Sequence, residues 1–189
     1  MKLKRILFAV LLFSSTLLVA QSMVGLNVND EDFELEGSVD ITGFSDNGHG
    51  TTYIVHGNFV STEIEELVSV GLSANNSFQG VDGLNLSLGI NMVFLEDYWA
   101  SPLMIRASYA LPLIETIPTV SLSARFLYAP SVLSFNEGEN YFEFRTEAGM
   151  EVISSVSVYM GYRNIEASYI DMSDKTFNDS FYGGLKIGF

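Results

Sequence analysis

The chain has 189 residues, enough for one domain or a small pair. It contains no cysteine, which excludes disulfides and also excludes a lipoprotein, because the lipid of a lipoprotein is attached to a cysteine. Hydrophobic residues make up 48% of the chain and the formal net charge is −14. This combination excludes an acidic disordered chain, which would be poor in apolar residues, and makes nucleic acid an unsuitable partner.

The first twenty residues resemble an export leader in their order of charge and hydropathy. Residues 1–5 contain three basic side chains, residues 6–13 are all apolar, and the segment ends on the small residue Ala20. This order predicts a signal peptide at 1–20 that is cleaved after Ala20, leaving residues 21–189 as a single domain. A membrane anchor is the alternative, but residues 6–20 are shorter than the roughly 20 mostly apolar residues of a spanning helix.

Beyond this leader, apolar and polar side chains alternate along the chain. Residues 84–92 place Leu, Leu, Leu, Ile and Met on one face and Asn, Ser, Gly and Asn on the other. A period of two predicts strands with one apolar and one polar face. In chain order, the predicted strands are 23–29, 33–41, 51–60, 67–75, 84–92, 103–111, 120–128, 142–152, 156–163 and 181–189. The first of these strands has the weakest pattern.

These ten strands predict an all-β fold, a closed antiparallel transmembrane β-barrel in the bacterial outer membrane with both termini in the periplasm. Eight strands remain the alternative, with two segments forming a plug or loops. Closure is required because lipid offers no hydrogen-bond partner to an open strand edge. The two longest connections, 131–139 and 168–178, fall on the outer side, where such barrels carry their longer loops. We expect outer-membrane lipid and lipopolysaccharide as the surroundings.

The basic residues lie mainly on the polar faces of the predicted strands. The three basic residues of the leader, subtracted from nine in the chain, leave six, and five of these have the polar parity. A charge facing lipid costs about 2–4 kcal/mol at the midplane, whereas in a lumen it can pair with acids of the same parity. A soluble sandwich with a charged face is the alternative. The predicted lumen charge network consists of Glu34, Glu36, Asp40, His56, Arg106, Arg125, Glu143, Arg145, Glu147, Glu151, Arg163 and Lys186.

The last predicted strand carries apolar side chains up to a terminal phenylalanine. The residues concerned are Phe181, Leu185, Ile187 and Phe189. This pattern resembles the C-terminal strand signal of outer-membrane barrels. The likeness implies insertion by the outer-membrane barrel assembly machinery.

Short motifs in the second half of the chain resemble the YfaZ family of bacterial outer-membrane β-barrel proteins. They are Tyr-Ala-Pro-Ser-Val-Leu-Ser-Phe at 128–135, Gly-Tyr-Arg-Asn-Ile-Glu at 161–166 and Gly-Leu-Lys-Ile-Gly-Phe at 184–189, with a looser match, His-Gly-Asn-Phe, at 56–59. The resemblance runs from about residue 53 to the end and implies a barrel of about ten strands. It carries over no catalytic or binding residue.

Three functions stay open at this point. The favoured one is a small barrel with a charge-lined, largely filled lumen, acting in envelope structure or surface interaction. The alternatives are a narrow pore for small solutes or ions and an outer-membrane hydrolase that uses His56, although a structural role for this histidine is favoured. No zinc, phosphate-loop, dinucleotide or Gly-x-Ser-x-Gly pattern occurs, so we expect no cofactor and no metal. The sequence predicts no oligomeric state.

Overall fold

The computed structural model describes residues 22–44, 50–62, 65–112, 118–170 and 175–189. The predicted signal peptide lies outside the described residues. The long strands are β1 (Met23–Val28), β2 (Phe33–Asp40), β3 (Thr51–Ser61), β4 (Glu66–Ser77), β5 (Leu84–Phe94), β7 (Leu103–Ala110), β8 (Val120–Ala129), β10 (Gly138–Ile153), β11 (Val156–Tyr169) and β12 (Lys175–Gly188). The shorter elements are β6 (Tyr98–Ala100), β9 (Ser134–Asn136) and the 3-10 turns η1 (Thr42–Phe44) and η2 (Ser131–Leu133).

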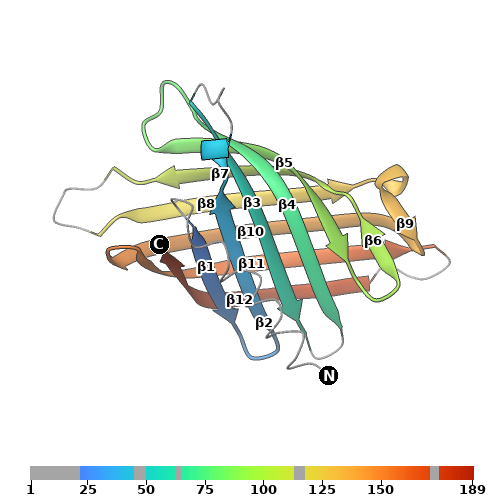
Figure 1. The fold of residues 1–189 in the computed structure, drawn as a ribbon. Helices are drawn as coiled ribbons and strands as arrows, with labels where there is room; N and C mark the ends of the chain where they lie inside the picture. The colour runs from blue at the N-terminus through green and yellow to red at the C-terminus, as the bar shows by residue number, and fades with distance from the viewer. Residues whose placement is uncertain (1–21, 45–49, 63–64, 113–117, 171–174) are drawn as a thin grey trace.

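The ten long strands form one closed antiparallel barrel (Figure 1). Each pairs with the next long strand along the chain, and β12 pairs back to β1 from Met23↔Gly188 to Val28↔Gly183. Backbone hydrogen bonds between Ser22 and Phe189, at 2.9 and 3.0 Å, tie the two ends together. The prediction of a ten-strand antiparallel barrel is confirmed, and β1, the strand with the weakest sequence pattern, completes the closure. In the described part of the chain, no helix has the length and apolar composition needed to cross a membrane.

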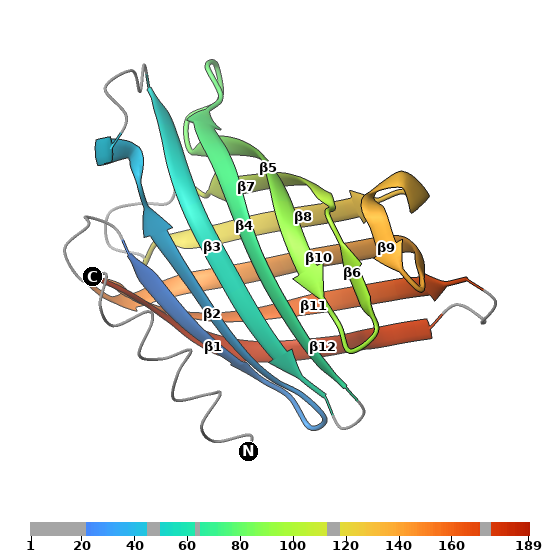
Figure 2. The same cartoon turned by 45° about the vertical axis from the view of Figure 1, so that its right-hand side comes forward.

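The two ends of the barrel differ in their connections (Figure 2). The terminal end carries both ends of the barrel chain and the connections β2–β3, β4–β5, β7–β8 and β10–β11. The opposite end carries β6 and β9, which pair with each other and form what we call the flap. This opposite end is named the flap end below.

The strands that reach the flap end are longer than their sequence pattern predicts. β10 begins at Gly138, β11 ends at Tyr169 and β12 begins at Lys175, so much of the predicted loops 131–139 and 168–178 is strand. The alternation of polar and apolar residues is interrupted there by register shifts between Gly138 and Asn140 and between Ile165 and Glu166. Backbone pairing continues across these irregularities, although the polar and apolar residues no longer alternate regularly.

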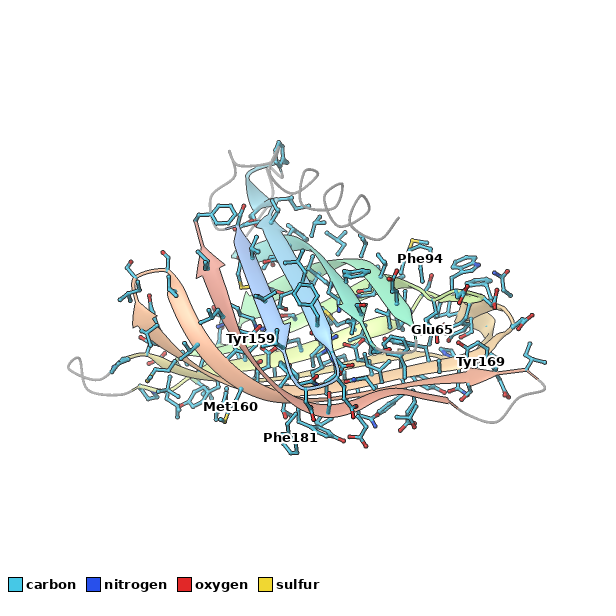
Figure 3. All side chains as sticks on the ribbon, turned by 90° about the horizontal axis from the view of Figure 1, so that it is seen from below. Glu65, Phe94, Tyr159, Met160, Tyr169 and Phe181 are labelled. Carbon is cyan, nitrogen blue, oxygen red and sulfur yellow. The ribbon has the colours of Figure 1, made fainter. Side chains whose placement is uncertain are left out.

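The outward faces of the strands are apolar and exposed. On β5 the outward side chains from Leu86 to Phe94 are 41–65% exposed, whereas the alternate positions Ser87 and Asn91 are buried inside. Met160 and Phe181, 69% and 78% exposed, project away from the barrel wall (Figure 3). A continuous apolar belt of this kind is unsuited to contact with water. The buried hydrophobic side chains, among them Leu67, Leu127 and Tyr141, lie on the other side of the wall, inside the barrel.

Candidate functional site: the barrel lumen

An ionic layer occupies the middle of the lumen. Arg145 on β10 contacts Glu34 of β2 and Glu143 of its own strand, with N–O distances of 2.6 Å to each. Arg163 on β11 contacts Oε2 of Glu34, also at 2.6 Å, and Arg125 on β8 contacts Glu143 at 2.7 Å. The side chains of Glu34, Glu143, Arg145 and Arg163 are at most 4% exposed. Charges buried to this degree persist only when they are paired.

The strand register explains why this layer needs acids from other strands. Arg106, Arg125, Arg145 and Arg163 are direct cross-strand partners along β7, β8, β10 and β11. Like charges placed opposite each other destabilise a sheet. Glu34 reaches the row from β2, on another part of the wall, and thereby links β2 to β10 and β11 through the lumen.

Neutral polar groups complete the ionic layer. The Glu34 carboxylate also accepts hydrogen bonds from the side-chain amides of Asn27 at 2.8 Å and Asn58 at 2.7 Å. The Tyr141 hydroxyl donates to Glu143 at 2.7 Å. Asn178 donates to Asp32, which also contacts Arg163 at 3.2 Å. The sequence argument selected charged residues and so missed these groups, although Asn27 and Asn58 share the inward parity that would have identified them.

A second ionic cluster lies closer to the terminal end. Lys186 of β12 contacts Glu147 at 2.6 Å and Glu36 at 3.2 Å, and its ammonium group lies 4.0 Å from the centroid of the Tyr159 ring. Tyr159 donates to Glu36 and Tyr182 donates to Glu147, both at 2.9 Å. The structure thus brings Glu36, Glu147 and Lys186 together as one cluster.

Four of the predicted residues take other positions. Asp40 accepts a hydrogen bond from the backbone N–H of Thr42, and exposed Glu151 accepts one from the backbone N–H of Ser155, so both end their strands instead of pairing with a cation. His56 Nε2 lies 3.2 Å from Asn91 Oδ1.

Arg106 is the fourth of these residues. It is half-buried and, among the residues that the structure describes, has no carboxylate within ion-pair distance. It stands at the end of the arginine row, with Arg125 as its partner on β8, and acts on Glu147 only through the electrostatic field, without a direct ion pair among the described residues.

Solvent access to the lumen falls steadily from the terminal end to the flap end. On β8 the inward residue Ser121 is exposed, Ser123 and Arg125 are half-buried, and Leu127 and Ala129 are 1% and 0% exposed. The inward face of β10 follows the same course from exposed Glu151 to fully buried Tyr141. Water therefore reaches the lumen from the terminal end and stops at the ionic layer.

Beyond the ionic layer, apolar side chains close the flap end. This apolar plug consists of Val60, Leu67, Val93, Tyr98, Leu127, Tyr141, Ile165 and Phe177. The flap residue Tyr98 contacts Ser134 through its hydroxyl at 3.3 Å and lies 5.5 Å from the Tyr169 ring. Its ring covers Gly138 so closely that a Cβ atom there would fall 1.5 Å from a ring carbon. Glycine at this position lets the flap close over the plug.

A family model described as YfaZ precursor matches residues 7–189, nearly the whole chain. The chain belongs to the YfaZ family. The match confirms the resemblance found in the sequence motifs, and the word precursor implies a processed leader. A YfaZ precursor that folds as a barrel is an outer-membrane or secreted protein.

Two solved structures are similar to this YfaZ barrel in chain path. The NanC porin aligns with a TM-score of 0.43 and 11% identity over 89% of this chain and 98% of that chain. The KdgM porin aligns with a TM-score of 0.42 and 9% identity over 90% of this chain and 99% of that chain. No curated protein matches the chain by sequence.

Proposed function

We propose that the protein is an outer-membrane barrel with a lumen closed at the flap end, acting in envelope structure or surface interaction and not as an open conduit. The terminal end faces the periplasm and the flap faces outward. The observation that carries this proposal is the fall in solvent access along the lumen from exposed Ser121 to fully buried Ala129 on β8.

The outer wall supports a membrane location. Most outward residues of the long strands are apolar, and the lumen holds the charges of the ionic layer. If these side chains faced lipid instead, each arginine would cost about 2–4 kcal/mol at the midplane and each glutamate less. Outer-membrane lipid and lipopolysaccharide are therefore the partners that we propose for the wall, and the barrel assembly machinery is the partner proposed for the strand that carries Phe181, Leu185, Ile187 and Phe189.

The ionic layer opposes opening of the lumen. Three arginines share two glutamates, and Glu34 alone joins strands from two parts of the wall. Breaking a buried ion pair by removing one partner costs about 3–5 kcal/mol. A water path past this layer would also have to displace the mainly apolar side chains of the plug, which offer little polar surface to a permeating ion.

The flap and the adjoining turn η2 provide a surface for contacts outside the membrane. Trp99 and Phe135 stack with ring centroids 3.9 Å apart, and Phe135 and Val132 are 36% and 76% exposed. Aromatic side chains of this kind favour the interface between lipid and water. A hydrolase is not favoured, since His56 contacts the amide of Asn91 and, in the described residues, no serine or carboxylate that would form a catalytic pair.

Conductance in planar bilayers tests the proposal. The refolded mature chain, shown to be folded by its heat-modifiable gel mobility, should give no steady openings. A Tyr98→Gly, Tyr141→Ala double variant, which empties the flap end, should give openings because the plug is lost. Steady openings of the unaltered protein that change when Arg125 or Arg145 is replaced would overturn the proposal in favour of a narrow pore.

A further inference from the structure

We infer that the lumen binds an oxyanion, a carboxylate or phosphate group, between Arg106 of β7 and Arg125 of β8. The two residues are direct cross-strand partners with inward side chains. The inference uses the proposed function only for the route of entry, which is the solvent-accessible terminal end.

The arginine row has more hydrogen-bond donors than the surrounding acids can accept. Arg106 forms no ion pair with a described residue, and the Arg125 Nε and Arg145 Nη2 atoms are buried without a hydrogen-bond partner. Each guanidinium group carries five N–H donors. A buried donor left unsatisfied costs about 1–3 kcal/mol, and more when the group is charged. These unpartnered cationic donors favour binding of an acceptor, preferably an anion.

Both oxygens of each neighbouring acid already accept hydrogen bonds. Glu143 uses one oxygen for Arg125 and Arg145 and the other for the Tyr141 hydroxyl. Glu147 uses one oxygen for Tyr182 and the other for Lys186. Neither carboxylate can turn toward Arg106 without losing a bond that it already makes.

Adjacent guanidinium groups suit an oxyanion in geometry as well as in charge. Side chains directly opposite each other on neighbouring strands have Cβ atoms about 4.5–5.5 Å apart. An oxyanion placed between Arg106 and Arg125 would relieve their mutual repulsion and accept from both planar groups, which favour two-point binding of carboxylate and phosphate. The row then becomes neutralised along its full length by acids at one end and by the ligand at the other.

Small polar residues line the approach to these two arginines. Ser108 and Ser123 are cross-strand partners one inward step closer to the terminal end, and exposed Ser121 follows them. On the other side of Arg106, the partner on β5 is the buried residue Ser87. Hydroxyl groups at these positions leave room for a ligand and can donate to its oxygens.

Nuclear magnetic resonance of the folded mature protein in detergent micelles tests the inference. The probes are inorganic phosphate and, in a separate arm, acetate, each titrated at constant ionic strength against sodium chloride while the arginine Nε–Hε signals are recorded. We expect saturable shifts of the Arg106 and Arg125 signals, and the arm with the tighter binding tells which group the site prefers. Shifts that grow linearly with concentration in both arms would overturn the site.

Variants separate this site from general attraction of anions. Arg106→Gln should weaken binding at least about tenfold, because a charged hydrogen-bond donor is removed, and Arg106→Lys should retain part of it. Lys175→Gln is the matched loss of one positive charge, at the start of β12 near the flap end, and should leave binding unchanged. Equal binding by Arg106→Gln and Lys175→Gln contradicts the inference. A conducting barrel that still binds the anion would overturn the proposed function alone, and a silent barrel that binds none would overturn this site alone.

Discussion

The two ends of the lumen are built from the same strands and yet have opposite character. At the terminal end the inward positions of β8 are Ser121 and Ser123, Arg125 follows in the ionic layer, and at the flap end the inward positions are Leu127 and Ala129. The terminal end is solvated and the flap end is dry. The comparison shows that an inward side chain in this barrel is not necessarily polar: alternation decides which side of the wall a residue faces, and position along the strand decides whether it meets water.

The ionic layer separates these two regions, and a substitution in it should lower the free energy of unfolding more than a substitution elsewhere in the lumen. Glu34→Ala removes the shared partner of Arg145 and Arg163, so the free energy of unfolding should fall by about 3–5 kcal/mol. Urea unfolding in micelles, followed by intrinsic fluorescence and gel mobility, measures this change. An effect below about 1 kcal/mol would mean that the layer does not hold the barrel together.

A substitution in the apolar plug should give the next largest loss of stability. Leu127→Ala leaves a cavity at the dry end, and the loss should be about 2–5 kcal/mol. Leu122→Ala on the same strand is the matched control, since Leu122 faces outward, is 45% exposed and should lose much less. Similar losses for the two leucines would contradict a packed plug at the flap end.

Packing of the flap against Gly138 should give a smaller effect on stability than the plug. Gly138→Ala puts a methyl group into the Tyr98 ring, so the flap must shift at a cost of about 1–3 kcal/mol. Gly43→Ala is the control, because an added Cβ there meets no atom within 4 Å. Thermal unfolding with tryptophan fluorescence reports on Trp99 in the flap; identical curves for the two variants would show that the flap does not pack against Gly138.

The smallest effect is expected where the terminal end meets water. Glu151 is exposed and accepts a hydrogen bond from the backbone N–H of Ser155 in the β10–β11 turn, so Glu151→Gln should change the free energy of unfolding by less than about 0.5 kcal/mol. The same urea titration measures it. A loss comparable with that of Glu34→Ala would restore Glu151 to the ionic network that the sequence predicted.

The fold could be predicted from the sequence because its signal is local. The period of two in residues 84–92 gives both the strand and its outward face, and the same holds for the other strands. The ends of the strands were predicted less accurately. The pairing of β10 and β11 on the flap side of Phe142 depends on backbone hydrogen bonds that continue through a register shift.

The charge network was only partly predictable. Parity places Glu34, Arg145 and Glu151 on the same side of the wall, but it does not give their depth in the lumen. Glu34 and Arg145 lie in the middle of the lumen and form an ion pair, whereas Glu151 lies at its terminal end. The apolar plug was not predicted at all. Leu127 and Ile165 occupy inward positions, and a pattern that assigns apolar residues to lipid cannot recognise an apolar interior.

The chain has no cysteine, so single cysteines placed along the inward face of β8 measure lumen access most directly. The folded protein carrying Ser121→Cys, Ser123→Cys, Leu127→Cys or Ala129→Cys is treated with a charged thiol reagent that does not enter apolar cores. We predict fast labelling at 121 and 123 and almost none at 127 and 129 until the protein is unfolded. Labelling at 129 as fast as at 121 would show an open lumen and contradict the account.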